Sequence, residues 1–284
     1  MWDGPEPDQQ ANDGGVVPET WVTIAKGTFT MGSPTNEPCR DTDEARHKVT
    51  LTHGFELQST EVTQAQFQSL MGYNPSQFPT SGEDCPVENV SWHEAAAYCN
   101  ARSHEAGRTK CYTCSGSGAT VTCQEAAAYS GQNVHNCPGY RFPTEAEWEY
   151  AYRAGTTTAY YSGANDGTTC YTCSTVDANA DKIGWYCGNL STKTQPIKRK
   201  QPNGWGLFDM AGNVWEWCHD WYQTDLGSGP AIDPWGAASG FSRVLRGASW
   251  FTYAASMRAA DRNSSTPLFR SQTIGFRCCR TITP

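Results

Sequence analysis

Short runs of alternating apolar and polar residues near the N-terminus predict β-strands. An apolar stretch begins at Trp21 and leads into a second strand that ends at Met31. After a polar loop, Val49 and Leu51 alternate with polar residues, and the pattern restarts at Phe55 after a glycine. Alternation with a period of two turns one face of each segment toward a core. This part of the chain is therefore expected to form several short strands.

Helix signals follow these strands. The first predicted helix covers 63–70 and ends at Gly72, a residue that tolerates the left-handed conformation common after a helix. At Ser91, a hydroxyl residue followed three positions later by Glu94 forms a capping box, in which each side chain accepts a hydrogen bond from a backbone N–H at the helix start. A second capping box begins at Thr144. Short strands and a few helices indicate an α+β fold with little regular secondary structure.

Two segments contain too few apolar residues to hold themselves in place. Residues 108–140 and 156–195 are rich in Gly, Ser and Thr. Since disulfides offset the conformational entropy that such segments lose on folding, we expect their cysteines to be bridged in irregular loops. We interpret both as Cys-rich insertions in one domain over 21–284, preceded by a flexible leader over 1–20 that is rich in Pro, Gly, Asp and Gln. The cysteines concerned are Cys111, Cys114, Cys123, Cys137, Cys170, Cys173 and Cys187.

The cysteine content also indicates a cellular compartment. Thirteen cysteines in 284 residues are typical of an oxidising environment, so we expect a secreted, periplasmic or cell-surface protein. The alternative is zinc binding, because Cys111 with Cys114 and Cys170 with Cys173 form two CxxC pairs. The two pairs lie much farther apart than the ~12–20 residues that usually separate such pairs in zinc sites. Disulfides are therefore favoured, and zinc is kept as an alternative.

Charge and hydropathy argue against other classes of partner. The net charge is -8 and no basic stripe is present, so neither nucleic acid nor an anionic membrane surface is expected to bind. No apolar run in the sequence has the length of a membrane span. The sequence shows no signal peptide; export, or a membrane tether, would then depend on a leader that has been removed.

Five motifs extend over residues 27–278. They are Gly27-x-Phe-x-Met-Gly-Ser33, Glu61-Val-Thr-x-x-Gln-Phe67, Arg141-Phe-Pro-Thr-Glu-Ala-Glu-Trp-Glu-Tyr-Ala151, Asn203-Gly-Trp-Gly-Leu-Phe-Asp-Met-Ala-Gly-Asn-Val-Trp-Glu-Trp217, and Arg246-Gly-Ala-Ser-Trp250 with Gly275-Phe-Arg-Cys278. In this order they resemble the formylglycine-generating enzyme, or sulfatase-modifying factor, family. The resemblance implies a compact α+β fold related to C-type lectin domains.

The chain departs from that family at the residues that carry its oxidase chemistry. The oxidases bind Cu(I) through two cysteines, five residues apart, shortly after the motif that begins here at Arg246, and they convert a substrate cysteine to formylglycine. The matching positions hold Thr252 and Met257, and no cysteine lies between Cys218 and Cys278. Because a hydroxyl and a thioether do not replace two thiolates as Cu(I) ligands, we expect neither copper nor this oxidase activity.

The resemblance also implies a structural calcium site. Family members hold Ca²⁺ with backbone carbonyls and one carboxylate, a donor set that suits this ion. Carried over position by position, the ligands are the carbonyls of Ala211, Gly212 and Val214 and the side chain of Glu216. A weaker match places a second site at Asn179 and Ala180. The alternative is that Glu216 is a paired carboxylate within an aromatic cluster.

One disulfide is implied by the resemblance alone. The family bridge between the second predicted helix and the last motif falls on Cys99 and Cys278, whereas a second family bridge is not expected because Tyr152 holds its first position. Among the histidines, only His219 stands beside other potential ligands, and we expect it on a surface turn.

The leading functional hypothesis is a secreted, non-catalytic binding or structural domain whose ligand is an unidentified protein or glycan. The first alternative is an enzyme of the same superfamily with a non-standard active site. No nucleophile–base pair supports that alternative, since Ser249 lies in a motif without a histidine near it in sequence. The second alternative is a zinc protein that uses the two CxxC pairs.

Overall fold

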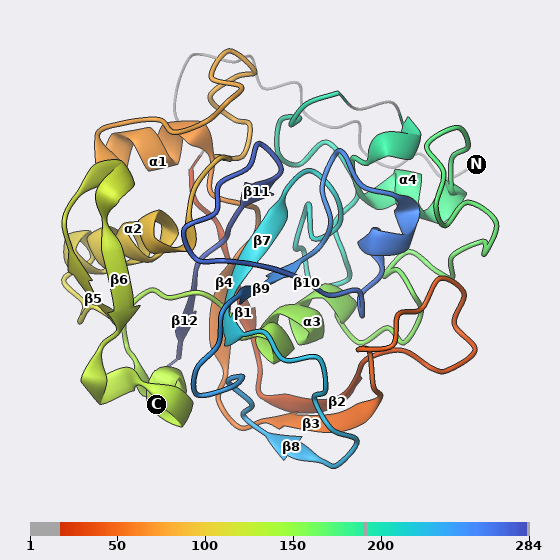
Figure 1. The fold of residues 1–284 in the computed structure, drawn as a ribbon, viewed down its shortest axis with the longest axis horizontal. Helices are drawn as coiled ribbons and strands as arrows, with labels where there is room; N and C mark the ends of the chain where they lie inside the picture. The colour runs from red at the N-terminus through yellow and green to blue at the C-terminus, as the bar shows by residue number, and fades with distance from the viewer. Residues whose placement is uncertain (1–17, 190–191, 283–284) are drawn as a thin grey trace.

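The computed structural model describes residues 18–189 and 192–282 (Figure 1). Its strands are β1 (Trp21–Ile24), β2 (Gly27–Met31), β3 (His47–Leu51), β4 (Phe55–Gln58), β5 (Tyr112–Ser115), β6 (Thr122–Glu125), β7 (Trp215–Trp221), β8 (Ala231–Ile232), β9 (Arg243–Arg246), β10 (Asn263–Ser265), β11 (Ile274–Gly275) and β12 (Cys279–Thr281). Its α-helices are α1 (Gln64–Met71), α2 (Trp92–Glu105), α3 (Glu145–Arg153) and α4 (Ala178–Ile183). Short 3₁₀ turns are η1 (Gly118–Thr120), η2 (Ala127–Tyr129), η3 (Gly131–Asn136), η4 (Cys187–Asn189) and η5 (Ala254–Met257).

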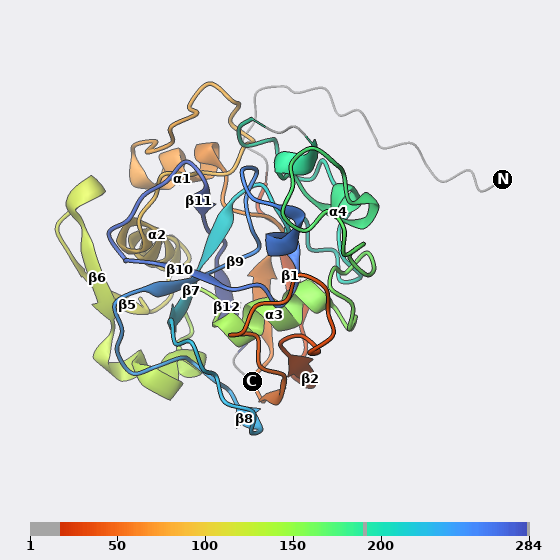
Figure 2. The ribbon, with the colours of Figure 1, turned by 45° about the vertical axis from the view of Figure 1, so that its right-hand side comes forward.

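The described strands form several small sheets instead of one large sheet. Strand β7 passes through the middle of the molecule, paired with β9 on one side and β11 on the other, and β10 extends the sheet beyond β9 (Figure 1). A second sheet has the order β1-β4-β12, and a third has the order β2-β3-β8. The β5–β6 hairpin stands apart at one edge beside α2, as Figure 2 shows. This α+β arrangement agrees with the fold class expected from the sequence.

The two capping boxes predicted from the sequence, at Ser91 and Thr144, are confirmed. Thr63, the first residue of the helix predicted over 63–70, is the N-cap of α1 and forms a further capping box. Helix α1 ends at Gly72 in the left-handed conformation, with a φ of 79°. Because these signals depend on local backbone geometry, they can be recognised without knowledge of the tertiary structure.

Buried arginine–glutamate pairs hold the long loops together. Four arginines have no exposed surface, and each pairs with a buried glutamate from another segment or turn: Arg141 with Glu147, Arg246 with Glu149, Arg258 with Glu44, and Arg277 with Glu216. The guanidinium groups also donate hydrogen bonds to loop carbonyls, as Arg246 does to Ala259 at 2.6 Å. Burying a charge is tolerated only when it is paired and hydrogen-bonded, so each arginine ties several loops to one point.

Three tryptophans form the centre of the core. Trp92, Trp148 and Trp217 are fully buried, and the indole N–H of each of these three has an acceptor. Trp92 donates to the Cys218 carbonyl at 3.0 Å, and Trp217 donates to the Val90 carbonyl at 3.0 Å. These bonds join α2 to β7 and satisfy the polar end of each ring inside the apolar interior.

Four disulfides confirm that the insertions are bridged. The pairs are Cys39–Cys170, Cys111–Cys137, Cys114–Cys123 and Cys173–Cys187. The expectation of irregular loops is wrong for Cys114 and Cys123, which lie opposite each other in the β5–β6 hairpin. Both CxxC pairs are consumed by these bridges, so their sulfurs are not available as zinc ligands and the zinc alternative is not supported.

Contacts with the domain begin before Trp21. Residues 1–17 of the expected leader lie outside the described residues, but Glu19 pairs with Arg102 at 2.5 Å and the Thr20 carbonyl accepts a hydrogen bond from Ser59. None of the helices in the described part of the chain has the length and apolar character that a membrane span requires.

Candidate functional site

The segment that follows β9 carries the positions that the resemblance assigns to the family's cysteine pair. It leaves the sheet through Gly247, whose φ is +93°. A β-carbon at this position would lie 2.9 Å from Trp148 and 3.0 Å from the Met210 carbonyl oxygen. Glycine is therefore required there for both conformation and space. The turn leads into η5 across the surface of the domain.

Thr252 and Met257 are both held by contacts within the fold. The Thr252 hydroxyl donates to the Ser249 carbonyl at 2.9 Å and accepts from the Ser249 N–H at 3.0 Å. Met257 is fully buried, and its carbonyl accepts the hydroxyl hydrogen of Tyr152 at 2.6 Å. Tyr152, which replaces a cysteine of the family pattern, thus supports the same segment by a hydrogen bond. Neither Thr252 nor Met257 offers a thiolate.

All five cysteines outside the disulfides are buried: Cys85, Cys99, Cys218, Cys278 and Cys279. Burial raises the pKa of the Cys85 thiol to about 12 and raises the pKa of Cys218 and Cys279 well above the ordinary thiol value. A reactive cysteine needs an accessible thiolate, which these environments disfavour. The vicinal cysteines point to different partners, since the Cys278 sulfur lies 3.1 Å from that of Cys99 while the Cys279 sulfur lies 3.1 Å from an Arg141 nitrogen.

Exposed aromatic rings lie beside this segment. Tyr171, Phe251 and Tyr253, which we call the aromatic patch, are 63%, 69% and 44% exposed. The rings of Tyr171 and Tyr253 meet edge to face with centroids 6.3 Å apart. The Cys39–Cys170 disulfide immediately precedes Tyr171, and the Ala255 N–H donates to the Cys170 carbonyl at 3.1 Å. The second insertion is therefore fastened to η5, which brings Tyr171 beside Tyr253, while the Phe251 ring lies against Trp250.

In the loop predicted to bind calcium, the Glu216 carboxylate already accepts hydrogen bonds from other side chains. Both oxygens of Glu216 accept hydrogen bonds from the Arg277 guanidinium at 2.8 Å, and one also accepts from the Trp148 indole N–H at 2.9 Å. This arrangement is what the paired-carboxylate alternative describes, and the positive guanidinium beside Glu216 disfavours a second cation there. Calcium at Ala211, Gly212, Val214 and Glu216 stays a prediction.

The weaker calcium position lies in helix α4. Asp177 caps this helix by accepting hydrogen bonds from the backbone N–H groups of Asn179 and Ala180. The Asn179 carbonyl accepts from the Ser162 hydroxyl at 2.8 Å, and its side-chain amide donates to the Ala164 carbonyl at 2.8 Å. These residues are engaged in helix capping and loop packing, and calcium at Asn179 and Ala180 also stays a prediction.

The expectation for His219 is wrong. This residue is buried in β7 and lies 3.5 Å from Glu125, whereas the sequence suggested a surface turn. Burial and the nearby Arg243 lower its pKa well below the ordinary histidine value. The aromatic-rich strand around it is buried on both faces, so the polar neighbours of His219 in sequence give no indication of its exposure.

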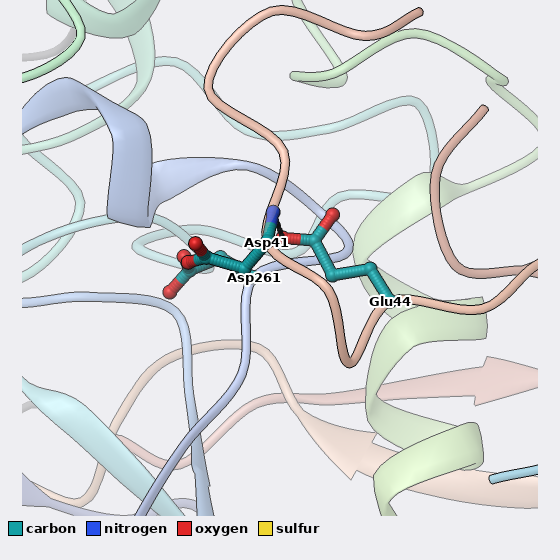
Figure 3. Close-up of side chains that lie close together, drawn as sticks. All are labelled: Asp41, Glu44 and Asp261. Atoms are coloured by element: carbon teal, nitrogen blue, oxygen red, sulfur yellow. Dashed lines mark hydrogen bonds between the residues drawn. The ribbon is translucent and has the colours of Figure 1, made fainter. Parts of the chain in front are cut away.

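An acidic cluster surrounds Arg258. Figure 3 shows the side chains of Asp41, Glu44 and Asp261 close together, and within the described residues they are the group whose ligand atoms are near enough for one metal ion. The Arg258 guanidinium already contacts Glu44 at 2.6 Å and Asp261 at 3.4 Å. Glu44 also accepts the Ser33 hydroxyl hydrogen at 2.6 Å. The arginine supplies the positive charge that pairs with Glu44, so the cluster anchors the segment after η5.

A family model and solved structures each match nearly the whole chain. The family model described as "Sulfatase-modifying factor enzyme 1-like domain" matches residues 7–282. The chain belongs to this family. Among solved structures it is similar to Treponema denticola variable protein 1, with 32% identity, a TM-score of 0.75, and coverage of 98% of this chain and 100% of that chain. It also shares the fold of PvdO from Pseudomonas aeruginosa, at 23% identity and a TM-score of 0.71 over 92% and 94% of the two chains.

Curated relatives of this sulfatase-modifying factor domain carry different names. The formylglycine-generating enzyme of Streptomyces coelicolor is 39% identical over 56% of this chain and 50% of its own length. The chaperone protein LppX of Paenibacillus barcinonensis is 34% identical over 61% and 64%. The chain thus spans half to two thirds of the length of these relatives. Family membership accounts for the fold, whereas function depends on the site.

Sequence reasoning missed the aromatic patch. The residues come from two segments that are about 80 positions apart, and contact between them depends on a disulfide to Cys39 that the sequence could not assign. One signal was available: Tyr171 is an aromatic residue in a segment with too little apolar content to bury it. Such a residue is a reasonable candidate for an exposed contact.

Proposed function

We propose that this protein is a non-catalytic binding domain that contacts a protein partner through the aromatic patch. The observation that carries the proposal is the exposure of Tyr171, Phe251 and Tyr253 next to the positions where the family's oxidases use cysteines. Exposed aromatic side chains on a surface held by disulfides are favourable contacts, because little conformational entropy is lost when they are buried. The four disulfides fit an extracellular or periplasmic location.

The family's oxidase activity is the competing function. Relatives in several organisms are named formylglycine-generating enzymes. Against this function stand the hydroxyl of Thr252, the buried thioether of Met257 and the buried thiols elsewhere in the chain. Soft thiolate ligands are what Cu(I) chemistry requires, and neither replacement provides them. The name of Treponema denticola variable protein 1 does not state an enzyme activity for that close structural neighbour.

The oxidase function is tested with a sulfatase peptide that contains the substrate cysteine. We expect no aldehyde by mass spectrometry after incubation with the purified protein, with or without added Cu(I). Restoring cysteines by Thr252→Cys and Met257→Cys in one variant provides a matched control for the assay. Copper-dependent loss of the peptide thiol with the unmodified protein would overturn the non-catalytic assignment.

The binding function is tested with peptides selected on the purified protein from a displayed library. Replacing Phe251 and Tyr253 by alanine is expected to weaken the selected peptides at least about 30-fold, the effect of losing a central aromatic contact. Phe241→Ala is the matched control, because Phe241 is 94% exposed and lies outside the patch. Selected ligands that bind the double variant as tightly as the unmodified protein would contradict the proposal, as would selective binding to a glycan array instead of peptides.

A further inference from the structure

A cavity of about 340 Å³ lies away from the aromatic patch, between β8, the start of α3 and the end of β7. Figure 1 shows β8 beside β3 at the lower edge of the molecule, with α3 above them. The apolar part of its wall includes Met31, Ile232 and Trp235, and its polar part includes His47, Glu145 and Asp220. A concave site with an apolar wall and a few directed polar groups is the usual form of a small-molecule site.

The polar part of the lining is mainly acidic, with two neutral side-chain amides from Gln132 and Gln223. The lining contains three carboxylates, from Glu145, Asp220 and Asp233, and neither lysine nor arginine. Glu145 is already paired with Arg262 at 2.6 Å, and the Asp233 carboxylate accepts two hydrogen bonds from Thr52. Asp220 is therefore the carboxylate with remaining capacity. This composition disfavours an anionic ligand and favours a cation.

Two largely buried residues line the cavity, and each has one polar atom without a hydrogen bond in the described part of the chain. Asp220 is 4% exposed, and one of its oxygens accepts the Glu145 backbone N–H at 2.7 Å while the other, Oδ1, has no hydrogen bond. His47 is 6% exposed, and its Nδ1 lies 2.9 Å from the Ala45 carbonyl. A carbonyl only accepts, so neutral His47 carries its hydrogen on Nδ1 and presents Nε2 as an acceptor. Neither atom is fully buried, so both are accessible to water or to a ligand in the cavity.

We propose that this cavity binds a primary amine carried on a short apolar body. An ammonium group has three donors and no acceptor, which matches Asp220 Oδ1 and His47 Nε2. The apolar body lies against Met31, Ile232 and the Trp235 ring, where a cation next to the indole gains a further attraction. A metal ion is disfavoured, since the acidic groups of this cavity are not close enough together to form a metal cluster within the described residues.

Ionisation of Asp220 couples amine binding to pH. Burial, the charge of Glu145 from α3 and the charge of Glu147 raise the pKa of Asp220 well above its usual value, and Arg243 from β9 opposes this rise. The charges of Arg262 and Arg246, with His47 from β3, lower the pKa of the neighbouring Glu145. Asp233 is a further carboxylate in the cavity lining. Because an ammonium group favours the ionised carboxylate, the raised pKa of Asp220 predicts that amine binding becomes tighter as the pH rises.

The test uses 2-phenylethylamine as the probe and 2-phenylethanol as the neutral ligand of nearly the same shape. Isothermal titration of the full-length protein is expected to show saturable amine binding, at least about 30-fold tighter than binding of the alcohol. Affinity for the amine is expected to rise with pH, whereas affinity for the alcohol should not depend on pH in this way.

Variants separate this cavity from the aromatic patch. Asp220→Asn retains an acceptor for the Glu145 N–H and is expected to abolish the preference for the amine over the alcohol. Trp235→Ala at the half-buried wall weakens the amine several-fold and keeps the proposal testable if Asp220→Asn does not fold. Phe251→Ala should leave amine binding unchanged. Equal binding of amine and alcohol, unchanged amine affinity in Asp220→Asn or Trp235→Ala, or no saturable amine binding would each overturn the proposal.

Discussion

Several buried arginines in this protein pair with glutamates from segments that are far apart in sequence. Arg277 of the last motif pairs with Glu216 of the fourth, and Arg246 pairs with Glu149 of α3. These residues belong to the motifs that define the family, yet their contacts are with the framework of the fold. A buried arginine that loses its glutamate keeps an uncompensated charge, which is far more costly than loss of an exposed pair.

Replacing Glu216 by glutamine measures this framework and tests calcium at the same residue. We expect the free energy of unfolding in urea to fall by about 3–5 kcal/mol, because Arg277 loses its buried counter-charge. Glu56→Gln is the control, since Glu56 pairs with Arg280 at a partly exposed surface and should cost at most about 1 kcal/mol.

The calcium prediction is tested by repeating the urea unfolding measurement in EGTA. Calcium held by Glu216 and the carbonyls of Ala211, Gly212 and Val214 would make the unmodified protein less stable in EGTA and leave the Glu216→Gln variant insensitive. A wild-type unfolding curve that is identical with calcium and with EGTA would remove this site.

At the scale of elements, α2 and the chain between β11 and β12 meet at a pair of cysteines. Cys99 of α2 and Cys278 have sulfurs 3.1 Å apart, with 179 positions between them in sequence. Both are buried against the aromatic core that α2 shares with Phe276. The proximity agrees with the family bridge expected from the sequence, and the covalent bond itself stays a prediction.

Peptide mapping of the unreduced protein tests that bond. We expect a linked peptide that joins Cys99 to Cys278, whereas Cys279 should be alkylated after denaturation without reduction. In the chain-entropy account a bridge across so long a loop contributes roughly 5 kcal/mol as an upper value, so replacing both cysteines by serine should lower stability measurably. Alkylation of Cys99 and Cys278 without prior reduction would show that they are free thiols.

For the molecule as a whole, buried carboxyl groups make stability depend on pH. Burial raises the pKa of Asp261 to about 8, and it raises those of Asp209 and Glu88 to about 6. A group whose pKa is higher in the folded state holds its proton more tightly there, so its stabilisation is full at low pH. For Asp261 this stabilisation is lost as the pH rises from about 4, its unfolded value, through about 8.

Asp261→Asn isolates this effect. The variant should show a flatter dependence of unfolding free energy on pH between about 4 and 8 than the unmodified protein. Groups with lowered pKa values, such as Glu44 and Glu147 beside their arginines, lose their stabilisation at lower pH and do not produce this slope. Equal slopes for the two proteins, measured by urea unfolding across that range, would contradict the assignment to Asp261.

The sequence by itself determined the local elements and the family. Helix caps at Thr63, Ser91 and Thr144 depend on residues only three positions apart, and the motifs were readable because framework contacts demand particular side chains. Only the tertiary structure decided which segments meet. The structure alone showed which cysteines pair and that His219 is buried. It alone also showed which residues form the aromatic patch and the cavity around Asp220. Such contacts are set by chain topology and packing, for which no local pattern carries the information.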